Sequence, residues 1–265
     1  MTHNLLSTLK DICRYQVTIT LVNNRSEAPE TLAGLKAFSS SENHHVIDAN
    51  FNFNFSKIIN LGVQHQLTSL AEDDLICILN NDIEFASVSD IEKLFDSFYQ
   101  YKAGVMGCTL RYPDHSIQHL YAQPGVKIVA SHPFKKQQFD PSHPWFQGAV
   151  KVPAVTGAVM LFTRKCFEDL EGLDENLPTV GQDVDFCMRA DLKGYAVMVD
   201  ASVCAIHHEG KTRGKSLQYD EVRYIYDKWG HQLETYPLLV PQQTRWSEKV
   251  IFSLGEGRYP WWLFV

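Results

Sequence analysis

The stretch LICILNNDIE (residues 75–84) decides which fold this sequence predicts, because its apolar run ends abruptly in amides and a carboxylate. An apolar run of this length predicts a strand that is buried on both faces of a sheet. Polar residues at the carboxyl end of such a strand lie where open α/β sheets bind ligands. Asp82 is therefore a candidate metal or phosphate ligand. The alternative is a simple turn at the strand end, since Asn and Asp favour turns for backbone reasons.

Similar apolar runs recur along the chain and alternate with helical patterns. The sequence SDIE (residues 89–92) is typical of a capping box, and apolar residues follow it at helical spacing. Strands that alternate with helices predict an α/β fold with a mainly parallel sheet flanked by helices. Residues 112–153 have no clean period and predict a long irregular insertion. The expected strands are residues 17–22, 45–47, 75–79, 105–108, 155–163 and 196–206.

Composition and charge limit the class of protein. The chain has 265 residues, enough for one domain with a substantial core, and a net charge of -7 that argues against a nucleic-acid partner. The six cysteines form no CxxC pair and indicate small buried hydrophobes in a reducing compartment. No apolar stretch is long enough to span a membrane, and the N-terminus does not resemble a signal peptide. We therefore expect a cytoplasmic protein.

The sequence GQDVDFCMRA (residues 181–190) places a carboxylate at the start of a predicted helix. Its apolar residues share one helical face, so Asp183 falls in the first turn. Asp fills an N-cap position well, and the helix dipole favours it there. A carboxylate in this place is also suited to accept a proton or to orient a hydroxyl. A structural cap and a catalytic role are both compatible with the pattern.

A second predicted strand ends in the polar, basic sequence HHEGKTRG. One imidazole, from His207 or His208, could complete an oxygen-rich divalent metal site with Asp82. In the following loop, Lys211 and Arg213 could contact phosphate oxygens. The alternative is a pair of surface histidines followed by a solvated basic loop.

The sequence AVTGAVML (residues 154–161) contains a glycine within a predicted strand. Gly157 could let the backbone approach a ligand closely, or it could mark a bulge. The GxGxxG, GxxxxGK, GxSxG and HExxH signatures are absent from the sequence. The chain therefore lacks the common nucleotide-binding and hydrolase motifs.

Taken together and in this order, these segments resemble the family 2 glycosyltransferases of the GT-A fold, particularly the bacterial O-antigen and polysaccharide type. The resemblance covers residues 5–243, and residues 244–265 form an aromatic tail that we expect to pack on this domain or to face a membrane. The NND sequence at residues 80–82 resembles the family's version of the DxD motif. The other matching segments are NFNFSK (52–57), NLG (60–62), SIQH (116–119), VTGA (155–158), DVDFCMR (183–189), HHEGKTRG (207–214) and KWG (228–230).

The resemblance implies inverting transfer of a sugar, of hexosyl or rhamnosyl type, from a nucleotide diphosphate donor, with Mg²⁺ or Mn²⁺ bridging the diphosphate. Asp82 would hold the metal together with His207 or His208. The metal would offset the charge that grows on the departing nucleotide diphosphate. Asp183 matches the family's catalytic base, which would deprotonate the acceptor hydroxyl.

The resemblance also implies residues that contact the donor and the acceptor. In the insertion and in the helix of Asp183, the expected acceptor contacts are Gln118, His119, Trp145 and Asp185, although Asp185 could instead orient the helix. The expected nucleotide-sugar contacts are Asn23, Lys57, Asn60, Asn80, Asn81, Gly157, Lys211 and Arg213.

The N-terminal part departs from the family pattern. Residues 17–26 match the family's second strand, whereas the usual first strand has no counterpart, so we expect the sheet to lack it. Loss of that strand would remove a wall of the nucleotide pocket and expose a neighbouring edge. In addition, Asn23 stands where the family usually has an Asp that reads the nucleobase, and an amide could bind a base with altered preference. A truncated active enzyme, a degenerate protein that binds without turnover, and a fragment completed by a partner all agree with this pattern.

The resemblance therefore implies a glycosyltransferase that extends a surface polysaccharide or glycolipid at the inner face of the cell membrane, with peripheral membrane contact left open. Its expected partners are a nucleotide diphosphate sugar and a saccharide or lipid-linked saccharide, with a homo-oligomer or a partner subunit left open. A non-catalytic binding or scaffold subunit derived from such an enzyme is the main alternative. A metal-dependent hydrolase is less favoured, because the sequence suggests no second carboxylate-rich metal cluster.

Overall fold

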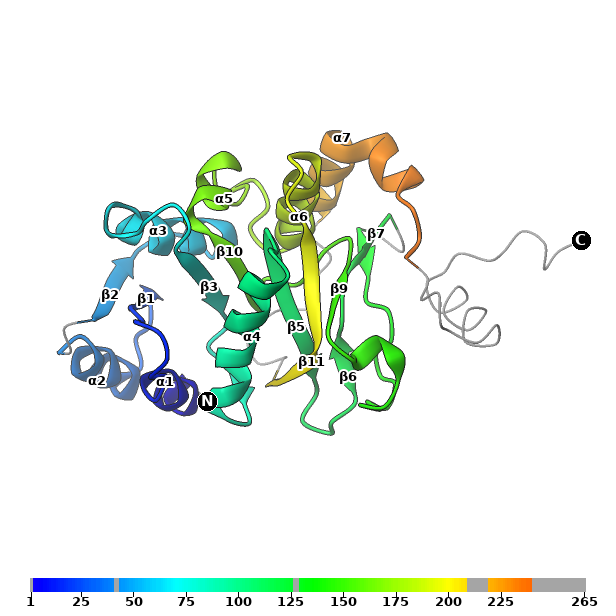
Figure 1. Ribbon diagram of the computed structural model, residues 1–265. Coiled ribbons are helices and arrows are strands. Elements are labelled where there is room, and N and C mark those ends of the chain that lie inside the picture. The colour runs from blue at the N-terminus through cyan, green and yellow to red at the C-terminus, as the bar shows by residue number, and fades with distance from the viewer. Residues whose placement is uncertain (1, 41–42, 126–128, 209–218, 240–265) are drawn as a thin grey trace, which may run out of the picture.

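A mixed sheet forms the centre of the protein, as the computed structural model in Figure 1 shows for residues 2–40, 43–125, 129–208 and 219–239. The strand order is β3 (Leu75–Leu79), β10 (Val159–Thr163), β5 (Val105–Arg111), β11 (Val197–His207) and β4 (Ile83–Phe85). Two short strands extend this sheet: β6 (Ile117–His119) pairs with β5, and β9 (Ala149–Lys151) pairs with β11.

The strand directions differ from the sequence-based expectation. Among the described strands of this central sheet, only β5 and β11 pair in parallel, whereas β10 runs antiparallel to both of its neighbours and β4 runs antiparallel to β11. The expectation of a mainly parallel sheet is therefore wrong. The physical reason is the way the strands are connected. A helical crossover carries the chain back to the first end of the sheet, so the next strand runs parallel, whereas a chain that re-enters the sheet at the end where the previous strand stopped runs antiparallel. The chain enters β10 from the irregular insertion, at the end of the sheet where β5 stops.

A separate parallel pair lies beside the β3 edge (Figure 1). It consists of β1 (Ile19–Asn24) and β2 (His44–Ala49), which are joined through α2 (Pro29–Phe38). Among the described residues these two strands are not hydrogen-bonded to the larger sheet. The absence of the family's first strand stays a prediction.

The helices cover both faces of the sheet. The strand β10 shows this most clearly, because Met160 and Phe162 lie in one apolar core and Val159 and Leu161 in the other. This period of two is the pattern of a strand buried on both faces. One core contains side chains of α1 (Thr2–Lys10) and α4 (Val88–Gln100), and the other contains side chains of α3 (Phe55–Gln66), α5 (Arg164–Asp169), α6 (Gln182–Leu192) and α7 (Tyr219–Thr235).

The capping box of α4 lies two residues earlier than the sequence suggested. Ser87 is the N-cap residue, and its backbone N–H donates to the carboxylate of Asp90 at 3.0 Å. The box therefore spans residues 87–90, not 89–92, because only Ser87 has the extended backbone that a cap requires.

The insertion at residues 112–153 contains little regular structure, and its aromatic side chains join the apolar core on one face of the sheet. Tyr121 and Trp145 stack with their ring centroids 5.6 Å apart, and Phe134 packs against the same tryptophan. Tyr121 and Trp145 share this core with Phe162 of β10, so the insertion packs against the sheet. The remaining short elements are β7 (Gln123–Pro124), β8 (Ala130–Ser131) and the 3-10 turns η1 (Leu67–Ser69) and η2 (Pro144–Phe146).

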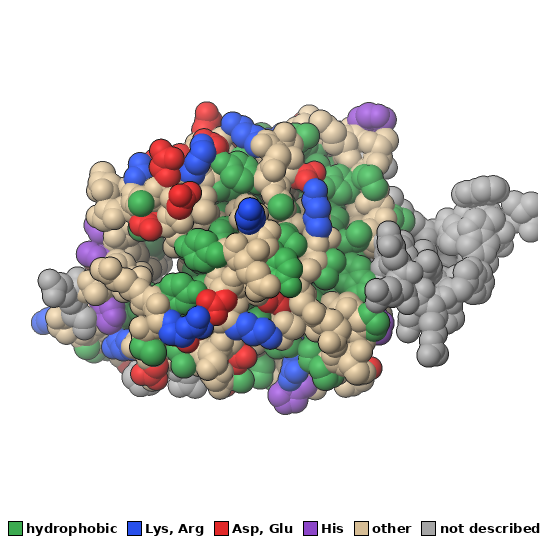
Figure 2. All heavy atoms as spheres, viewed as in Figure 1, with side chains coloured by type: hydrophobic (Ala, Val, Ile, Leu, Met, Phe, Trp, Pro, Cys, Tyr) green, Lys and Arg blue, Asp and Glu red, His purple; other side chains and the backbone are tan. Residues whose placement is uncertain are grey.

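The surface carries charges of both signs. Acidic and basic side chains are interspersed over the face shown in Figure 2. Among the described helices, none is both long enough and apolar enough to cross a bilayer.

Candidate functional site

The carboxylate of Asp82, which follows β3, lies beside the imidazole of His207, which ends β11. Asp82 lies in the turn between β3 and β4, and His207 is the last residue of β11. The His207 Nε2 atom is 3.2 Å from Asp82 Oδ1 and 3.4 Å from the Asn80 side-chain nitrogen. The antiparallel pairing of β4 with β11 causes this meeting, because it places His207 opposite Ile83.

The two adjacent histidines have different partners. The His208 Nε2 atom is 2.8 Å from a carboxylate oxygen of Glu84, and its backbone N–H donates to the carbonyl oxygen of Asp82. Successive side chains of an extended backbone point to opposite sides, so only one of the two rings can approach Asp82. The structure places His207 there, and His208 beside Glu84.

Asp82 and His207 are suited to hold a divalent cation. Two adjacent ligands of an octahedral ion with bonds of about 2.1 Å lie about 3 Å apart. The 3.2 Å separation of Asp82 Oδ1 and His207 Nε2 agrees with that spacing. The carboxylate suits Mg²⁺ or Mn²⁺, with substrate oxygens and water as further ligands, whereas an imidazole is a ligand more typical of first-row transition metals such as Zn and Fe. In the part of the chain that the structure describes, no group of three or more His, Cys, Asp or Glu residues could hold a metal.

Asp183 lies in the first turn of α6, directly opposite a glycine. Its Oδ2 atom accepts a hydrogen bond of 3.1 Å from the backbone N–H of Gly157. The N-cap residue is not Asp183 but Gly181, whose φ of 78° is in the left-handed region. A side chain at Gly181 would also collide with Ile225, since an added Cβ would lie 2.4 Å from its Cδ1 atom. The interpretation of Asp183 as an N-cap is therefore wrong.

Gly157 joins the Asp183 carboxylate to Asp82 and His207 in one connected set. A Cβ at this position would lie 3.0 Å from a ring carbon of Phe55, so the absence of a side chain admits the ring. The next residue, Ala158, accepts a hydrogen bond of 2.9 Å from the backbone N–H of Asn80. Hydrogen bonds and close contacts thus run from Asp183 through residues 157, 158 and 80 to His207, and from there to Asp82.

One expected nucleotide contact, Asn23, lies beside a carboxylate that sequence reasoning missed. The amide of Asn23 donates to Asp48 Oδ1 at 2.8 Å, and its oxygen accepts from the backbone of Ser26. Asp48 is exposed at the end of β2, opposite Asn23 in the parallel register. The sequence signal that could have identified Asp48 is its place near the end of the second predicted strand, which corresponds to the place of Asn23 near the end of the first. Lys57 is exposed at the start of α3, with its Nζ atom 4.9 Å from the centroid of the Phe51 ring.

Asn60 has a structural role instead of the expected nucleotide contact. Its side chain is buried, donates to the carbonyl oxygen of Leu173 at 2.8 Å and accepts from the backbone N–H of Leu173 at 2.9 Å. Its nitrogen also donates to Glu175. The amide therefore fastens the loop between α5 and α6 to α3. By contrast, Asn81 is exposed in the turn beside Asp82, where a ligand can reach it.

The expected acceptor contacts of the insertion are buried. Gln118, His119 and Trp145 have exposed fractions of 5%, 4% and 7%. The His119 Nδ1 atom is 2.8 Å from Nδ1 of His132, and burial, with some help from the charge of His132, lowers the pKa of His119 well below its usual value. Packing thus buries all three side chains, and their expected contact with an acceptor stays a prediction.

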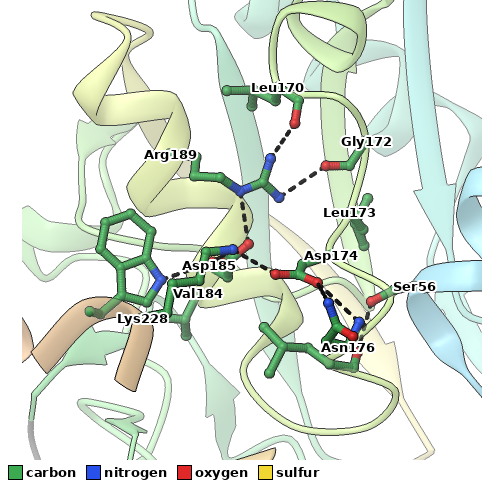
Figure 3. Close-up of polar contacts among 12 residues, drawn as sticks. Ser56, Leu170, Gly172, Leu173, Asp174, Asn176, Val184, Asp185, Arg189 and Lys228 are labelled. Atoms are coloured by element: carbon green, nitrogen blue, oxygen red, sulfur yellow. Dashed lines mark hydrogen bonds and ion pairs between the residues drawn. The ribbon is translucent and has the colours of Figure 1, made fainter. Parts of the chain in front are cut away.

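Asp185 orients its helix, the second of the two roles that the sequence left open. It is fully buried, and its carboxylate accepts from Arg189 Nε at 2.8 Å and from Trp229 Nε1 at 2.8 Å (Figure 3). The Lys228 Nζ atom lies 2.7 Å from the same carboxylate and 2.6 Å from Asp174. Burial alone would raise the pKa of Asp174, but hydrogen bonds from Lys228, Asn176 and Tyr224 lower it to about 2. This network attaches α7 to α6.

Two further expected donor contacts, Lys211 and Arg213, lie outside the described residues, as does the aromatic tail at 244–265.

Comparison with known proteins identifies the family. Residues 2–170 match the model described as Glycosyl transferase family 2. The O-antigen biosynthesis protein RfbC of Myxococcus xanthus is 30% identical over 223 residues, which cover 79% of this chain and 17% of that protein. The N-acetylglucosaminyl-diphospho-decaprenol L-rhamnosyltransferase of Mycobacterium tuberculosis is 24% identical over 66% of this chain and 57% of its own length. The chain thus spans a minor part of the first relative and somewhat over half of the second.

Solved structures support the same fold. The crystal structure of GalNAc-T7 with UDP, GalNAc and Mn²⁺ superposes with a TM-score of 0.64 at 14% identity, covering 98% of this chain and 52% of that one. The structure of Staphylococcus aureus TarS 1-349 gives a TM-score of 0.52 at 14% identity, covering 78% and 56%. Both likenesses concern the α/β fold with a mixed sheet. Since the match to the family model covers more than half of this chain, the chain belongs to glycosyl transferase family 2.

Proposed function

We propose that this chain transfers a sugar, of hexosyl or rhamnosyl type, from a nucleotide diphosphate donor to a saccharide or lipid-linked saccharide, with inversion at the anomeric carbon. The observation that carries the proposal is the connected set from Asp183 through Gly157 and Asn80 to His207 and Asp82. This set connects Asp183, whose carboxylate is suited to deprotonate a hydroxyl, with Asp82 and His207, which are suited to bind a divalent cation.

In this proposal Asp82 and His207 would hold Mg²⁺ or Mn²⁺ when the donor binds. The bound cation would offset the negative charge that develops on the leaving nucleotide diphosphate. Asn80 contacts His207, and the exposed Asn81 lies within reach of the donor. Asn23 and Asp48 lie at the ends of β1 and β2, where they would contact the nucleobase or ribose. The crystal structure of GalNAc-T7 contains UDP and Mn²⁺, which supports this kind of donor and ion.

Asp183 would act as the base. The N–H of Gly157 orients one carboxylate oxygen at 3.1 Å, and the other oxygen contacts the backbone N–H of Val184 at 2.9 Å. Its side chain is only partly buried, so an acceptor hydroxyl can reach it. A carboxylate held in this way can remove the hydroxyl proton as the oxygen attacks the anomeric carbon, which typically supplies a rate factor of about 10² to 10⁴.

The relatives support an acceptor that belongs to surface polysaccharide synthesis, at the cytoplasmic side of a membrane. One relative is named for O-antigen biosynthesis and another for transfer of L-rhamnose to a decaprenol-linked sugar. The alternative is a degenerate protein that binds a donor without turnover. The observation that favours it is Asn23, whose amide is already hydrogen-bonded to Asp48 and Ser26.

The two functions are separated by measuring donor binding and turnover on the same protein. We expect one of a panel of UDP-, GDP- and dTDP-sugars to raise the melting temperature in the presence of Mn²⁺, because a bound ligand stabilises the folded state by mass action. Release of nucleoside diphosphate on addition of lipid-linked saccharide would then report transfer. Asp183→Asn should abolish release and keep binding, while Asp191→Asn, an exposed position on the same helix, should change neither. Binding without release in the parent protein would support the degenerate alternative, and no binding with any donor would exclude both.

A further inference from the structure

Gln118 makes two contacts with His207, the histidine that we propose as a metal ligand. Gln118 lies on β6, and its amide is buried. Its Oε1 atom is 2.7 Å from Nδ1 of His207, and its Nε2 atom is 3.3 Å from the backbone carbonyl oxygen of His207. The amide therefore contacts both the ring and the main chain of one residue, on the side of the ring away from Asp82.

These two contacts define which way the amide faces. A backbone carbonyl oxygen only accepts, so the amide group that contacts it must be the NH₂. The amide oxygen then faces Nδ1 of His207, and since that oxygen also only accepts, Nδ1 must carry a hydrogen. In a neutral imidazole with a hydrogen on Nδ1, the other nitrogen has a free lone pair. When the His207 ring is neutral, its Nε2 lone pair therefore lies on the side of Asp82, whose Oδ1 atom is 3.2 Å away, and of the Asn80 amide nitrogen, which is 3.4 Å away.

We infer that Gln118 is a positioning residue that holds His207 in the tautomer required to bind a divalent cation through Nε2. This inference rests on the proposed metal role of Asp82 and His207. Hydrogen bonds of this kind, from the second ring nitrogen of a metal-binding histidine, orient the ring and favour the ligating tautomer. In place of an acceptor contact, Gln118 acts through the histidine that it touches.

Removal of the amide should allow a competing arrangement. Once the Gln118 oxygen no longer accepts from Nδ1, a neutral His207 can carry its hydrogen on Nε2 and donate it to the Asp82 carboxylate. Both proposed metal ligands would then be engaged with each other, and a cation would have to displace that hydrogen bond. Metal affinity should fall even if the fold is intact.

The first test measures the tautomer without any metal. In ¹⁵N-labelled, metal-free protein at a pH where the ring is neutral, long-range ¹H–¹⁵N spectra should show His207 with its hydrogen on Nδ1, assigned by comparison with His207→Ala. In Gln118→Leu the hydrogen should move to Nε2, whereas Gln118→Glu should keep it on Nδ1 because a carboxylate also accepts. An unchanged tautomer in Gln118→Leu would overturn the inference.

The second test measures Mn²⁺ binding in the presence of UDP by electron paramagnetic resonance. We expect Gln118→Leu to weaken Mn²⁺ binding by about 10- to 100-fold, and Gln118→Glu to remain within a few-fold of the parent. Gln123→Leu is the matched control, because it removes another buried amide of the insertion that hydrogen-bonds to the segment after α7. That variant should bind Mn²⁺ as the parent does, and equal weakening in both leucine variants would refute the positioning role. If the parent binds no Mn²⁺, the proposed metal function fails, and the tautomer measurement still decides the role of Gln118.

Discussion

The backbone N–H of Gly157 donates a hydrogen bond of 3.1 Å to Asp183, which joins the start of α6 to the segment that leads into β10. The same segment hydrogen-bonds to the backbone of Asn80 in the turn that contains Asp82. The position of the proposed base is therefore coupled to the position of the proposed metal ligands by a short path of main-chain contacts. This coupling and the buried networks around it lead to four predictions.

Gly157→Ala should impair turnover more than binding. The added Cβ would lie 3.0 Å from the Phe55 ring, so the ring or the backbone must shift, and the N–H that orients Asp183 shifts with it. Because small misplacements of catalytic groups cost up to about 100-fold in rate, we expect kcat to fall about tenfold or more. Steady-state kinetics with the identified donor measures this. Gly34→Ala, where an added Cβ has no atom within 4 Å, is the control and should leave kcat unchanged.

His207→Ala and His208→Ala should differ sharply in metal dependence. Only the His207 ring faces Asp82, whereas the His208 ring pairs with Glu84. We expect His207→Ala to raise the Mn²⁺ concentration required for half-maximal activity by more than tenfold, and His208→Ala to change it by less than about threefold. Titration of Mn²⁺ at saturating donor measures both. Comparable shifts in the two variants would exclude the assignment of the ligand to His207 alone.

Asp185→Asn should destabilise the fold. Its buried carboxylate pairs with Arg189 and Lys228, and removal of one member of a buried ion pair costs about 3–5 kcal/mol. Urea unfolding followed by circular dichroism gives the free energy of unfolding. The control is Asp191→Asn, whose exposed pair with Lys151 at 3.5 Å should contribute at most about 1 kcal/mol. A similar loss in both variants would contradict the buried network as the source of stability.

Stability should fall as the pH drops below about 6.5, partly through His119. Its pKa in the folded protein is well below the usual value because burial disfavours the charged ring. The unfolded chain therefore binds a proton first as the pH falls through about 6.5, and the free energy of unfolding decreases by up to about 1.4 kcal/mol per pH unit until the folded pKa is reached. Urea unfolding at pH 7.5 and 5.5 should show a smaller difference in His119→Gln than in the parent. A difference as large as that of the parent would assign the pH dependence to other groups.

Much of the local structure could be predicted because it depends on near neighbours. The strand at residues 75–79 is found at its expected limits, and the first turn of α6 contains Asp183 as the helical spacing indicated. Polar residues after apolar strands identified the end of the sheet where the candidate site lies. The strand directions could not be predicted in this way, because they depend on how the insertion returns the chain to β10.

Individual side-chain roles show the same division. Asn60, Gln118 and Asp185 lie in segments that resemble the family. The resemblance implied a ligand contact for Asn60 and Gln118, and for Asp185 it left open a ligand contact or a role in orienting its helix. The structure buries all three and satisfies them with groups more than fifty residues away or on another element, such as Leu173, His207 and Trp229. Position along a helix or strand says which face a residue occupies but not what lies against that face.

The sequence by itself determined the periodicity of the elements, the polar strand ends and the family of this chain, because each depends on residues only a few positions apart or on motif order. Only the tertiary structure decided that His207 and not His208 approaches Asp82, and that Gln118 lies behind that ring. The physical reason is that hydrogen-bond partners and burial are set by packing between strands and helices that are distant in the chain. A local pattern contains no information about which distant group will occupy the space beside it.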